Sequence, residues 1–220
     1  WNSMVEEKVL PASTEDKRRR AAQGRTVKAV RLDEVKSGAE SRIDTEIGEL
    51  NRVLGGGLVT GSLTLISGEP GIGKSTLIIQ AASKIASKGQ PVLYITGEES
   101  LEQIRMRADR VCKGNMENLY LLSETNMENA LAVTEELKPC FLVIDSIQTM
   151  YSAELESAPG SVSQVRACTN ELMREGKERN IPVFIVAHVT KSGDLAGPKI
   201  IEHLVDCVLY FTGERNQEIR

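Results

Sequence analysis

The stretch GEPGIGKST, residues 68–76, decides the fold class of this chain. It fits the pattern G-x-x-x-x-G-K-[S/T] and lies between the apolar run LTLIS, typical of a buried strand, and STLIIQAASKIASKG, whose apolar spacing predicts a helix. This order of strand, glycine-rich loop and helix predicts a loop that holds phosphate on its backbone N–H groups. A glycine-rich turn that binds nothing is the alternative, and the flanking strand and helix favour nucleotide binding.

The residue types in this loop suit a nucleotide and a metal ion. Glycines at positions 68, 71 and 73 allow the backbone to curl so that successive N–H groups point inward. Lys74 is expected to pair with the β- and γ-phosphates, and the Ser75 hydroxyl is expected to ligate Mg²⁺. The residues that we expect to bind nucleotide are Gly68, Glu69, Pro70, Gly71, Ile72, Gly73, Lys74, Ser75 and Thr76.

Strands and helices alternate along the rest of the chain. The segments PVLYITG (91–97), NLYLLS (118–123), CFLVIDS (140–146) and IPVFIVAH (181–188) predict strands, and residues 100–111, 126–138 and 162–179 predict helices. The alternation predicts an α/β fold with a mostly parallel, twisted sheet and helices on both faces. Ligands of such sheets bind at the carboxyl ends of the strands.

Acidic residues follow two of the predicted strands at that edge. Asp145 ends the strand FLVID and is expected to hold Mg²⁺ beside the phosphate loop. Glu98 and Glu99 follow the strand 91–97, and we expect Glu98 to be the base that activates the attacking water, with Glu99 as the other candidate. Helix capping is the alternative for all three carboxylates. The expected catalytic residues are therefore Glu98, Lys74 and Asp145.

Composition and charge restrict the function classes. The chain has 220 residues, of which 40% are hydrophobic and 26% charged, enough for one globular core with an extension. Residues 1–40 are polar and contain the basic run 17–20, so we expect a flexible linker or arm there and a single domain over 41–220. The net charge of -4 argues against binding nucleic acid through bulk charge, so such binding requires a local basic patch.

The cysteines and the apolar runs indicate the compartment. Cysteines at 112, 140, 168 and 207 show neither zinc-ligand nor disulfide spacing, so we expect reduced, mostly buried thiols. No apolar run reaches the roughly 18 residues that a membrane-spanning helix needs. A cytoplasmic location is the expectation.

Several further strings resemble one family. The segments LNRVLGGGLVTGS, YITGEESLEQIRMRA, VIDSIQTM, APGSVSQVR and HVTKSGDLAGPKIIEHLVD are similar to the RadA/Sms family of RecA-like ATPases, over about residues 28–212. The base-reading N-K-x-D of GTPases is missing. The resemblance implies a RecA-like P-loop core and an ATP- and Mg²⁺-dependent ATPase that binds single-stranded DNA and forms a homo-oligomeric ring, expected to be a hexamer. It also implies branch migration of recombination intermediates in DNA repair, with a recombinase-type protein as a further partner.

The resemblance assigns roles to residues near two more strand ends. His188 is expected to sense the γ-phosphate. Lys191 and Lys199, in the loop after the strand 181–188, and Arg166, at the start of the helix 162–179, are expected to contact DNA phosphates. A plain surface connection is the alternative for the two lysines.

The family resemblance also implies segments on either side of this chain. Family members carry a four-cysteine zinc module just before a Trp-Asn pair like Trp1-Asn2, and a K-N-R-F-G motif and a Lon-protease-like domain beyond the position of Arg220. We therefore expect zinc only in such an amino-terminal module, and weak ATP hydrolysis by this chain alone, because an arginine from a neighbouring subunit contributes roughly a thousandfold or more.

Two other function classes stay open. A KaiC-like regulatory ATPase or a small-molecule phosphotransferase would share the phosphate loop, although the arginine-rich lid of a phosphotransferase is not found. A non-catalytic switch that uses ATP only to fix a binding surface is the other class.

Overall fold

The computed structural model describes residues 31–34, 42–189 and 197–212. The chain divides into two compact units, Trp1–Ala39 and Glu40–Arg220. The described part of the first unit is a short 3₁₀ turn, η1 (Leu32–Glu34), and most of the linker expected over residues 1–40 lies outside the described residues. The second unit contains the sheet and the helices that surround it.

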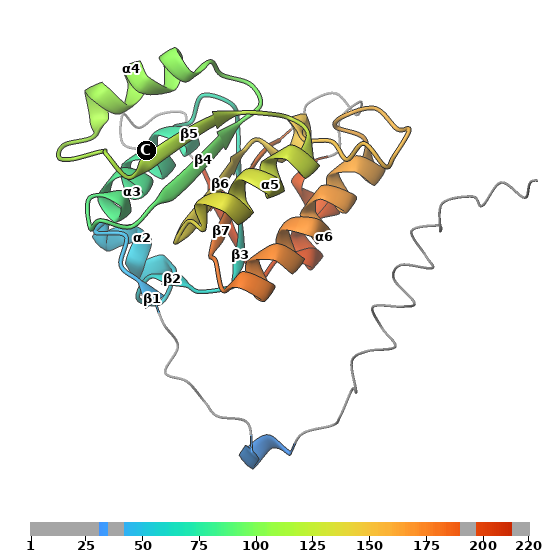
Figure 1. Cartoon of the computed structure of the whole chain (residues 1–220), viewed down its shortest axis with the longest axis horizontal. Helices are drawn as coiled ribbons and strands as arrows, with labels where there is room; N and C mark the ends of the chain where they lie inside the picture. Colours follow the sequence, from blue (N-terminus) through green and yellow to red (C-terminus); the bar gives the residue numbers. More distant parts are fainter. Residues whose placement is uncertain (1–30, 35–41, 190–196, 213–220) are drawn as a thin grey trace, which may run out of the picture. The chain divides into compact units, whose positions relative to one another are not determined.

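A six-stranded parallel sheet forms the centre of the second unit (Figure 1). Its strands are β3 (Leu63–Gly68), β4 (Val92–Thr96), β5 (Leu119–Ser123), β6 (Phe141–Asp145), β7 (Val183–His188) and β8 (Cys207–Phe211). They lie in the order β5-β4-β6-β7-β3-β8, and each neighbouring pair is parallel. The strand that leads into the phosphate loop therefore lies beside β7, with β6 and then β4 beyond it.

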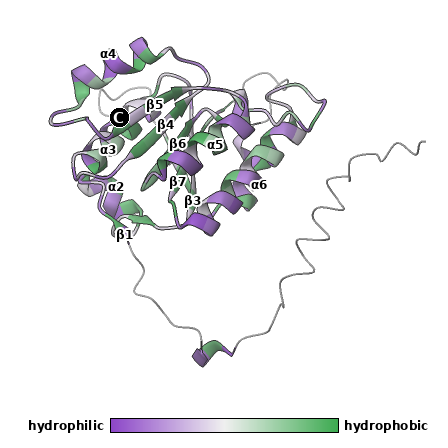
Figure 2. Cartoon of the chain, viewed as in Figure 1, coloured by the Kyte–Doolittle hydropathy of each residue, from purple (hydrophilic) through white to green (hydrophobic). Residues whose placement is uncertain are grey.

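Helices bury both faces of this sheet. Two long helices, α3 (Lys74–Ala86) and α4 (Leu101–Val111), pack on one face, and α5 (Met127–Leu137) and α6 (Val162–Arg179) pack on the other. Alternate residues of each central strand enter the two cores. Figure 2 shows the hydrophobic colour of strands such as β4. Strands that are buried on both faces read as continuous apolar runs, which is why they were recognisable in the sequence.

The helices begin at the residue types that the sequence offers as caps. Ser100 caps α4 in a reciprocal capping box with Gln103, and Asn126 and Ser161 accept from backbone N–H groups in the first turns of α5 and α6. α6 ends at Asn180, whose left-handed conformation (φ 56°) stops the helix. Ser100, Asn126 and Ser161 thus fix where the loops at the carboxyl edge of the sheet end.

Several shorter elements were not expected from the sequence. They are the antiparallel pair β1 (Arg42–Ile43) and β2 (Leu58–Val59), helix α2 (Gly48–Val53), and the 3₁₀ turns η2 (Ile147–Thr149), η3 (Pro198–Ile200) and η4 (Glu202–Leu204). Strand β8 at the edge of the sheet was also unexpected. The elements other than β8 have too few residues to show a periodic pattern in the sequence. β8 is an apolar run of five residues, CVLYF, as long as β4 and β6, and was missed in the sequence.

The predicted fold class is confirmed: the structure is an α/β core of the RecA-like P-loop type, with a parallel sheet and helices on both faces. The expectation for the cysteines needs a correction. All four thiols are free, but only Cys168 is buried; the other three are half-buried and lie at or next to the ends of α4, β6 and β8. Among the described helices, none has the length and apolar character to cross a membrane.

Candidate active site

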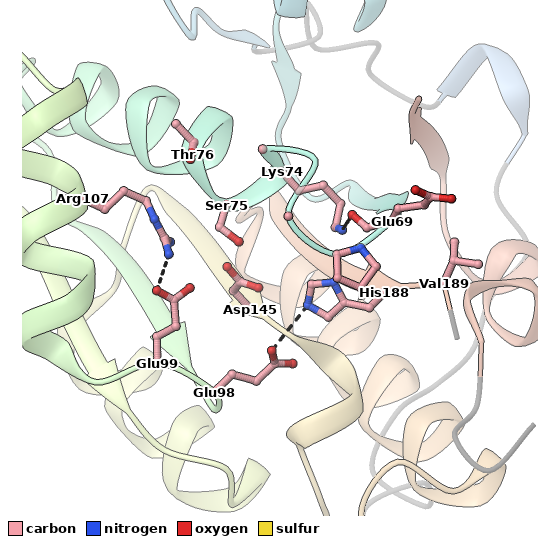
Figure 3. A pocket seen from close by; sticks show the side chains of 13 residues that line it. Glu69, Lys74, Ser75, Thr76, Glu98, Glu99, Arg107, Asp145, His188 and Val189 are labelled. Atoms are coloured by element: carbon pink, nitrogen blue, oxygen red, sulfur yellow. Dashed lines mark hydrogen bonds and ion pairs between the residues drawn. The ribbon is translucent and has the colours of Figure 1, made fainter. Parts of the chain in front are cut away.

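A cavity of about 1090 Å³ opens where the carboxyl ends of β3, β4, β6 and β7 meet. Its described lining residues are Glu69, Pro70, Gly71, Gly73, Lys74, Ser75, Thr76, Glu98, Glu99, Arg107, Asp145, His188 and Val189 (Figure 3). The volume is at the upper end of the range for small-molecule sites and is large enough for a nucleoside triphosphate. Gly68 and Ile72 are the two expected loop residues that do not line the cavity.

The loop between β3 and α3 has the backbone that a phosphate cradle needs. Gly71 and Gly73 adopt positive φ angles of 76° and 111°, and α3 begins directly afterwards at Lys74. Gly68 is required for a different reason, because a Cβ atom there would lie 2.4 Å from the carbonyl oxygen of Phe211 in β8. The loop therefore presents N–H groups and the positive end of α3 to the cavity.

The buried Lys74 ammonium closes this loop from within. Its Nζ donates to the carbonyl oxygens of Gly68 at 2.8 Å and Glu69 at 2.9 Å. An ammonium has three N–H donors, so one remains for another acceptor. Burial lowers the pKa of Lys74, while the charges of Asp145 and Glu98 act in the opposite direction.

Asp145 lies at the end of β6 with one carboxylate oxygen already held. The hydroxyl of Tyr94, which is wholly buried in β4, donates to Asp145 Oδ2 over 2.5 Å. Burial, with the Asp145 charge, raises the pKa of Tyr94 well above its ordinary value, so the phenol stays protonated as a donor. Asp145 is no helix cap, since η2 begins after Ser146 without a side-chain cap.

The chemistry of these oxygen donors fits Mg²⁺. Asp145 and Ser75 both line the cavity, and Mg²⁺ prefers one or two protein oxygens together with substrate phosphates and water. Among the described residues, no group of three or more His, Cys, Asp and Glu side chains could hold a metal ion by itself. The site therefore suits a metal that arrives with its substrate.

The two adjacent glutamates have different partners. Glu98 accepts a hydrogen bond from the Ser146 hydroxyl, and its Oε2 lies 3.5 Å from Nε2 of His188. The hydrogen bond with His188 is the main cause that lowers the pKa of Glu98; Ser146 and the charge of Lys74 lower it further, and burial opposes them. Glu99 forms an ion pair with Arg107. Neither glutamate caps α4, because Ser100 does so.

His188 ends β7, the strand between the phosphate loop and Asp145. Its backbone is held by the Gln148 side chain. The backbone N–H of His188 donates to Oε1 of Gln148 at 3.1 Å, and Nε2 of Gln148 donates to the backbone carbonyl of His188 at 2.7 Å. Its ring faces Glu98 on one side, and Nδ1 is buried with no hydrogen-bond partner among the described residues (Figure 3).

The residues expected to contact DNA lie outside this cavity. Arg166 is exposed near the start of α6, as its fifth residue, and Lys199 is exposed in η3. Lys191 falls outside the described residues. The structure therefore brings together the expected catalytic residues and His188, but it does not bring Arg166 or Lys199 to them.

The site residues that sequence reasoning missed include Arg107 and Val189, which line the cavity, and Tyr94, Ser146 and Gln148, which contact Asp145, Glu98 and His188. Arg107 belongs to a helix whose inward face is marked by the buried residues Ile104 and Ala108. The spacing of Arg107 from Ile104 along this helix could have indicated that it also points inward. Gln148 lies three residues after Asp145, in a 3₁₀ turn that has no periodic signal.

Comparison with known proteins gives consistent matches. The family model described as an AAA domain matches residues 26–194. The chain is 50% identical over 224 residues to DNA repair protein RadA of Bacillus subtilis (strain 168), and 49% identical over 220 residues to DNA repair protein RadA of Listeria monocytogenes (serovar 1/2a). In each case the match covers 100% of this chain and 48% of the relative, so the chain spans about half the length of these curated relatives.

Proposed function

The chain belongs to the AAA domain family, and from this premise we propose that it binds ATP with Mg²⁺ in the cavity around Lys74 and hydrolyses it. One observation carries the proposal. The phosphate loop, Asp145 and Glu98 come from three different strands and line one cavity at the carboxyl edge of the sheet. An NTPase needs a phosphate cradle, a metal-holding carboxylate and a base at such an edge.

Each side chain has a defined part in this proposal. The loop N–H groups bind the phosphates, and Lys74 turns donors from the Gly68 and Glu69 carbonyls to phosphate oxygens. Ser75 and Asp145 hold the metal, with Tyr94 fixing the orientation of the Asp145 carboxylate. Bound Mg²⁺ would supply positive charge that neutralises the phosphates as charge develops on them.

Glu98 is the base in this proposal. Its pKa is lowered by His188 and Ser146, so it is a carboxylate at neutral pH and can accept a proton from water. It borders both the cavity and His188, which suits His188 as a sensor of the γ-phosphate. Glu99 is engaged by Arg107 instead, which makes it the weaker candidate.

Two glutamine substitutions test this assignment. Glu98→Gln should retain nucleotide binding and lower single-turnover ATP hydrolysis by about 10²- to 10⁴-fold, the usual size of a general-base contribution. Glu99→Gln is the matched control and should lower the rate much less. Unchanged hydrolysis by Glu98→Gln would contradict the assignment, and a wild-type chain that retains ATP without turnover would favour a non-catalytic switch.

We also propose that the chain binds single-stranded DNA, in keeping with the DNA repair role that the names of its RadA relatives state. Two observations support a basic contact near the cavity. The connection from β6 to α6 leaves the carboxyl edge of the sheet, so α6 starts near that edge with Arg166 exposed. His188 leads from the cavity to the segment that contains Lys191 and Lys199.

Fluorescence anisotropy with a labelled single strand tests this contact at two salt concentrations, with ADP and with a non-hydrolysable ATP analogue. Arg166→Ala, Lys191→Ala and Lys199→Ala should each weaken binding and reduce the salt slope by about one, as loss of one phosphate contact does. The exposed Lys113, beyond α4, provides the control Lys113→Ala. Equal salt slopes for all four variants and the wild type would contradict the proposal.

For the whole protein, we propose a cytoplasmic homo-oligomeric ring, hexameric by expectation, that drives branch migration of recombination intermediates and has a recombinase-type partner. The family membership and the RadA relatives support this proposal. Light scattering of the chain with and without nucleotide and DNA measures the assembly. A strict monomer under every condition would count against a ring formed by this chain alone.

A further inference from the structure

Arg107 is the charged residue of the cavity that the proposed mechanism leaves unused. It lies on α4 between Ile104 and Ala108, which are both buried, and its side chain is only 19% exposed. By contrast, Arg105 and Arg110 on the same helix are exposed. A guanidinium on the inward face of a helix is costly unless its donors are satisfied.

The donors of Arg107 are only partly satisfied. Nη2 pairs with the Glu99 carboxylate, and this contact raises the pKa of Arg107 against the effect of burial. Nη1 is buried and has no hydrogen-bond acceptor among the described residues. Glu99 therefore holds one edge of a rigid planar fork and leaves the other without an acceptor.

The Arg107 side chain lines the candidate nucleotide site. Arg107 lines the cavity together with Ser75 and Thr76, at the first turn of α3. In the view of Figure 3 its side chain reaches from α4 toward Ser75, with Lys74 on the other side of Ser75. In that view the cationic side chains of Lys74 and Arg107 thus lie on opposite sides of Ser75.

The charges that line the cavity show why a second positively charged side chain matters. Four carboxylates line it in the described structure, those of Glu69, Glu98, Glu99 and Asp145. The Lys and Arg side chains among the described lining residues are Lys74 and Arg107. A polyphosphate that enters this cavity meets strong negative charge. This charge favours a role for both Lys74 and Arg107 in binding the polyphosphate.

We propose that Arg107 binds the nucleotide itself, by donating to the α-phosphate of a nucleoside di- or triphosphate. In a loop of this type the lysine reaches the β- and γ-phosphates and the loop backbone holds the α- and β-phosphates. The phosphate chain then runs from Lys74 past Ser75 toward Thr76 and Arg107. This inference rests on the proposed nucleotide binding and adds a residue to it.

Titration calorimetry with Mg²⁺-ADP and with a non-hydrolysable Mg²⁺-ATP analogue tests the role of Arg107. Arg107→Ala should raise Kd for both nucleotides by the same factor, about 10- to 100-fold, which is typical for the loss of a hydrogen bond to a charged group. Arg105→Ala is the matched control on the same helix, since Arg105 pairs with Asp109 at the surface, and its Kd values should stay within about twofold of wild type.

Thermal unfolding without nucleotide separates binding from folding in these variants. Where Arg107→Ala does not fold, Arg107→Lys decides, because it keeps a charge for Glu99 but loses the planar fork; higher Kd values for both nucleotides support the inference. Wild-type Kd values for a folded Arg107 variant, or a loss confined to the triphosphate, overturn it. A wild-type chain that binds neither nucleotide contradicts the proposed function as well.

Discussion

At the scale of single residues, the contact between Glu98 and His188 can be tested most directly. The two side chains approach each other from β4 and β7, with Asp145 of β6 between the two strands. The hydrogen bond with His188 is the largest cause of the lowered pKa of Glu98, and Ser146 adds to it. Because a base must be deprotonated to act, this pair sets the acidic limit of the proposed activity.

We predict that His188→Ala moves the acid limb of the pH-rate profile to higher pH. Removing the imidazole takes away the largest cause that lowers the pKa of Glu98, so this pKa rises and protonation inactivates the base at a higher pH than in wild type. Single-turnover hydrolysis measured across the acidic range checks this. Ser146→Ala should shift the limb in the same direction by a smaller amount, and an unmoved limb in His188→Ala would contradict the pairing.

At the residue scale, the sequence could predict those site residues whose positions follow from spacing within a local motif. Residues Gly71 to Thr76, Asp145 and Glu98 follow directly from motifs at strand ends. The partners of these residues depend on tertiary contacts instead: Tyr94 reaches Asp145 across 51 positions, and Gln148 reaches the His188 backbone across 40 positions. No local pattern carries such pairings.

At the scale of elements, the short turn η2 packs tightly against Gly97 at the end of β4. Thr149 in η2 donates from its hydroxyl to the Ser146 carbonyl at 2.8 Å. A Cβ atom on Gly97, which joins β4 to Glu98, would lie 2.0 Å from this Thr149 oxygen and 2.6 Å from the Thr149 Cβ. The close approach leaves no room for a side chain beside the proposed base.

We predict that Gly97→Ala lowers the free energy of unfolding by about 1–3 kcal/mol, as overpacking at a tight contact does, and slows hydrolysis by displacing Glu98. Urea unfolding and the single-turnover rate measure the two effects. Gly48→Ala in α2 is the control, because a Cβ there meets nothing within 4 Å and should leave stability unchanged or higher. Wild-type stability and rate for Gly97→Ala would contradict the contact.

The loop between β6 and α6 is held by another buried side chain, that of Gln164. Its Oε1 accepts from the Ser152 N–H at 2.8 Å, and its Nε2 donates to the Ser157 carbonyl at 2.9 Å, with further contacts to the carbonyls of Ser152 and Leu155. Gln164 is 1% exposed. One amide thus satisfies backbone groups along residues 152–157, the segment that precedes Arg166.

We predict that Gln164→Ala costs about 1–3 kcal/mol of unfolding free energy, because buried backbone groups lose their partners. Hydrogen exchange of the amides in residues 152–158 should accelerate more than exchange elsewhere. Asn170→Ala, at an exposed position of the same helix, should change stability by less than about 0.5 kcal/mol. Equal exchange in the two variants would contradict this role for Gln164.

The long elements could be predicted, and the short ones could not. Strands such as β4 and β6 are continuous apolar runs, and α6 was expected over the residues that form it, Val162–Arg179. By contrast, α2 has six residues and η2 has three, too few for a periodic pattern. Their positions depend on packing against the sheet.

At the scale of the whole molecule, the strand order builds the site. Because β7 lies between β3 and β6, and β4 lies beyond β6, the carboxyl edge carries the phosphate loop, His188, Asp145 and Glu98 in that spatial order. Their order along the chain is different. The sequence predicted a parallel sheet but did not determine which strands are neighbours, so the place of His188 between the phosphate loop and Asp145 came only from the structure.

The nucleotide-induced gain in thermal stability, compared between wild type and Lys74→Ala, tests the central claim most directly. At a Mg²⁺-ADP concentration 100 times Kd, linkage stabilises the wild type by about 2.7 kcal/mol, which raises Tm by roughly 5–10 °C for a domain of this size. Lys74→Ala should lose most of this shift, and the exposed-lysine control Lys113→Ala should keep it. A full shift in Lys74→Ala, or none in wild type, would contradict nucleotide binding at this loop.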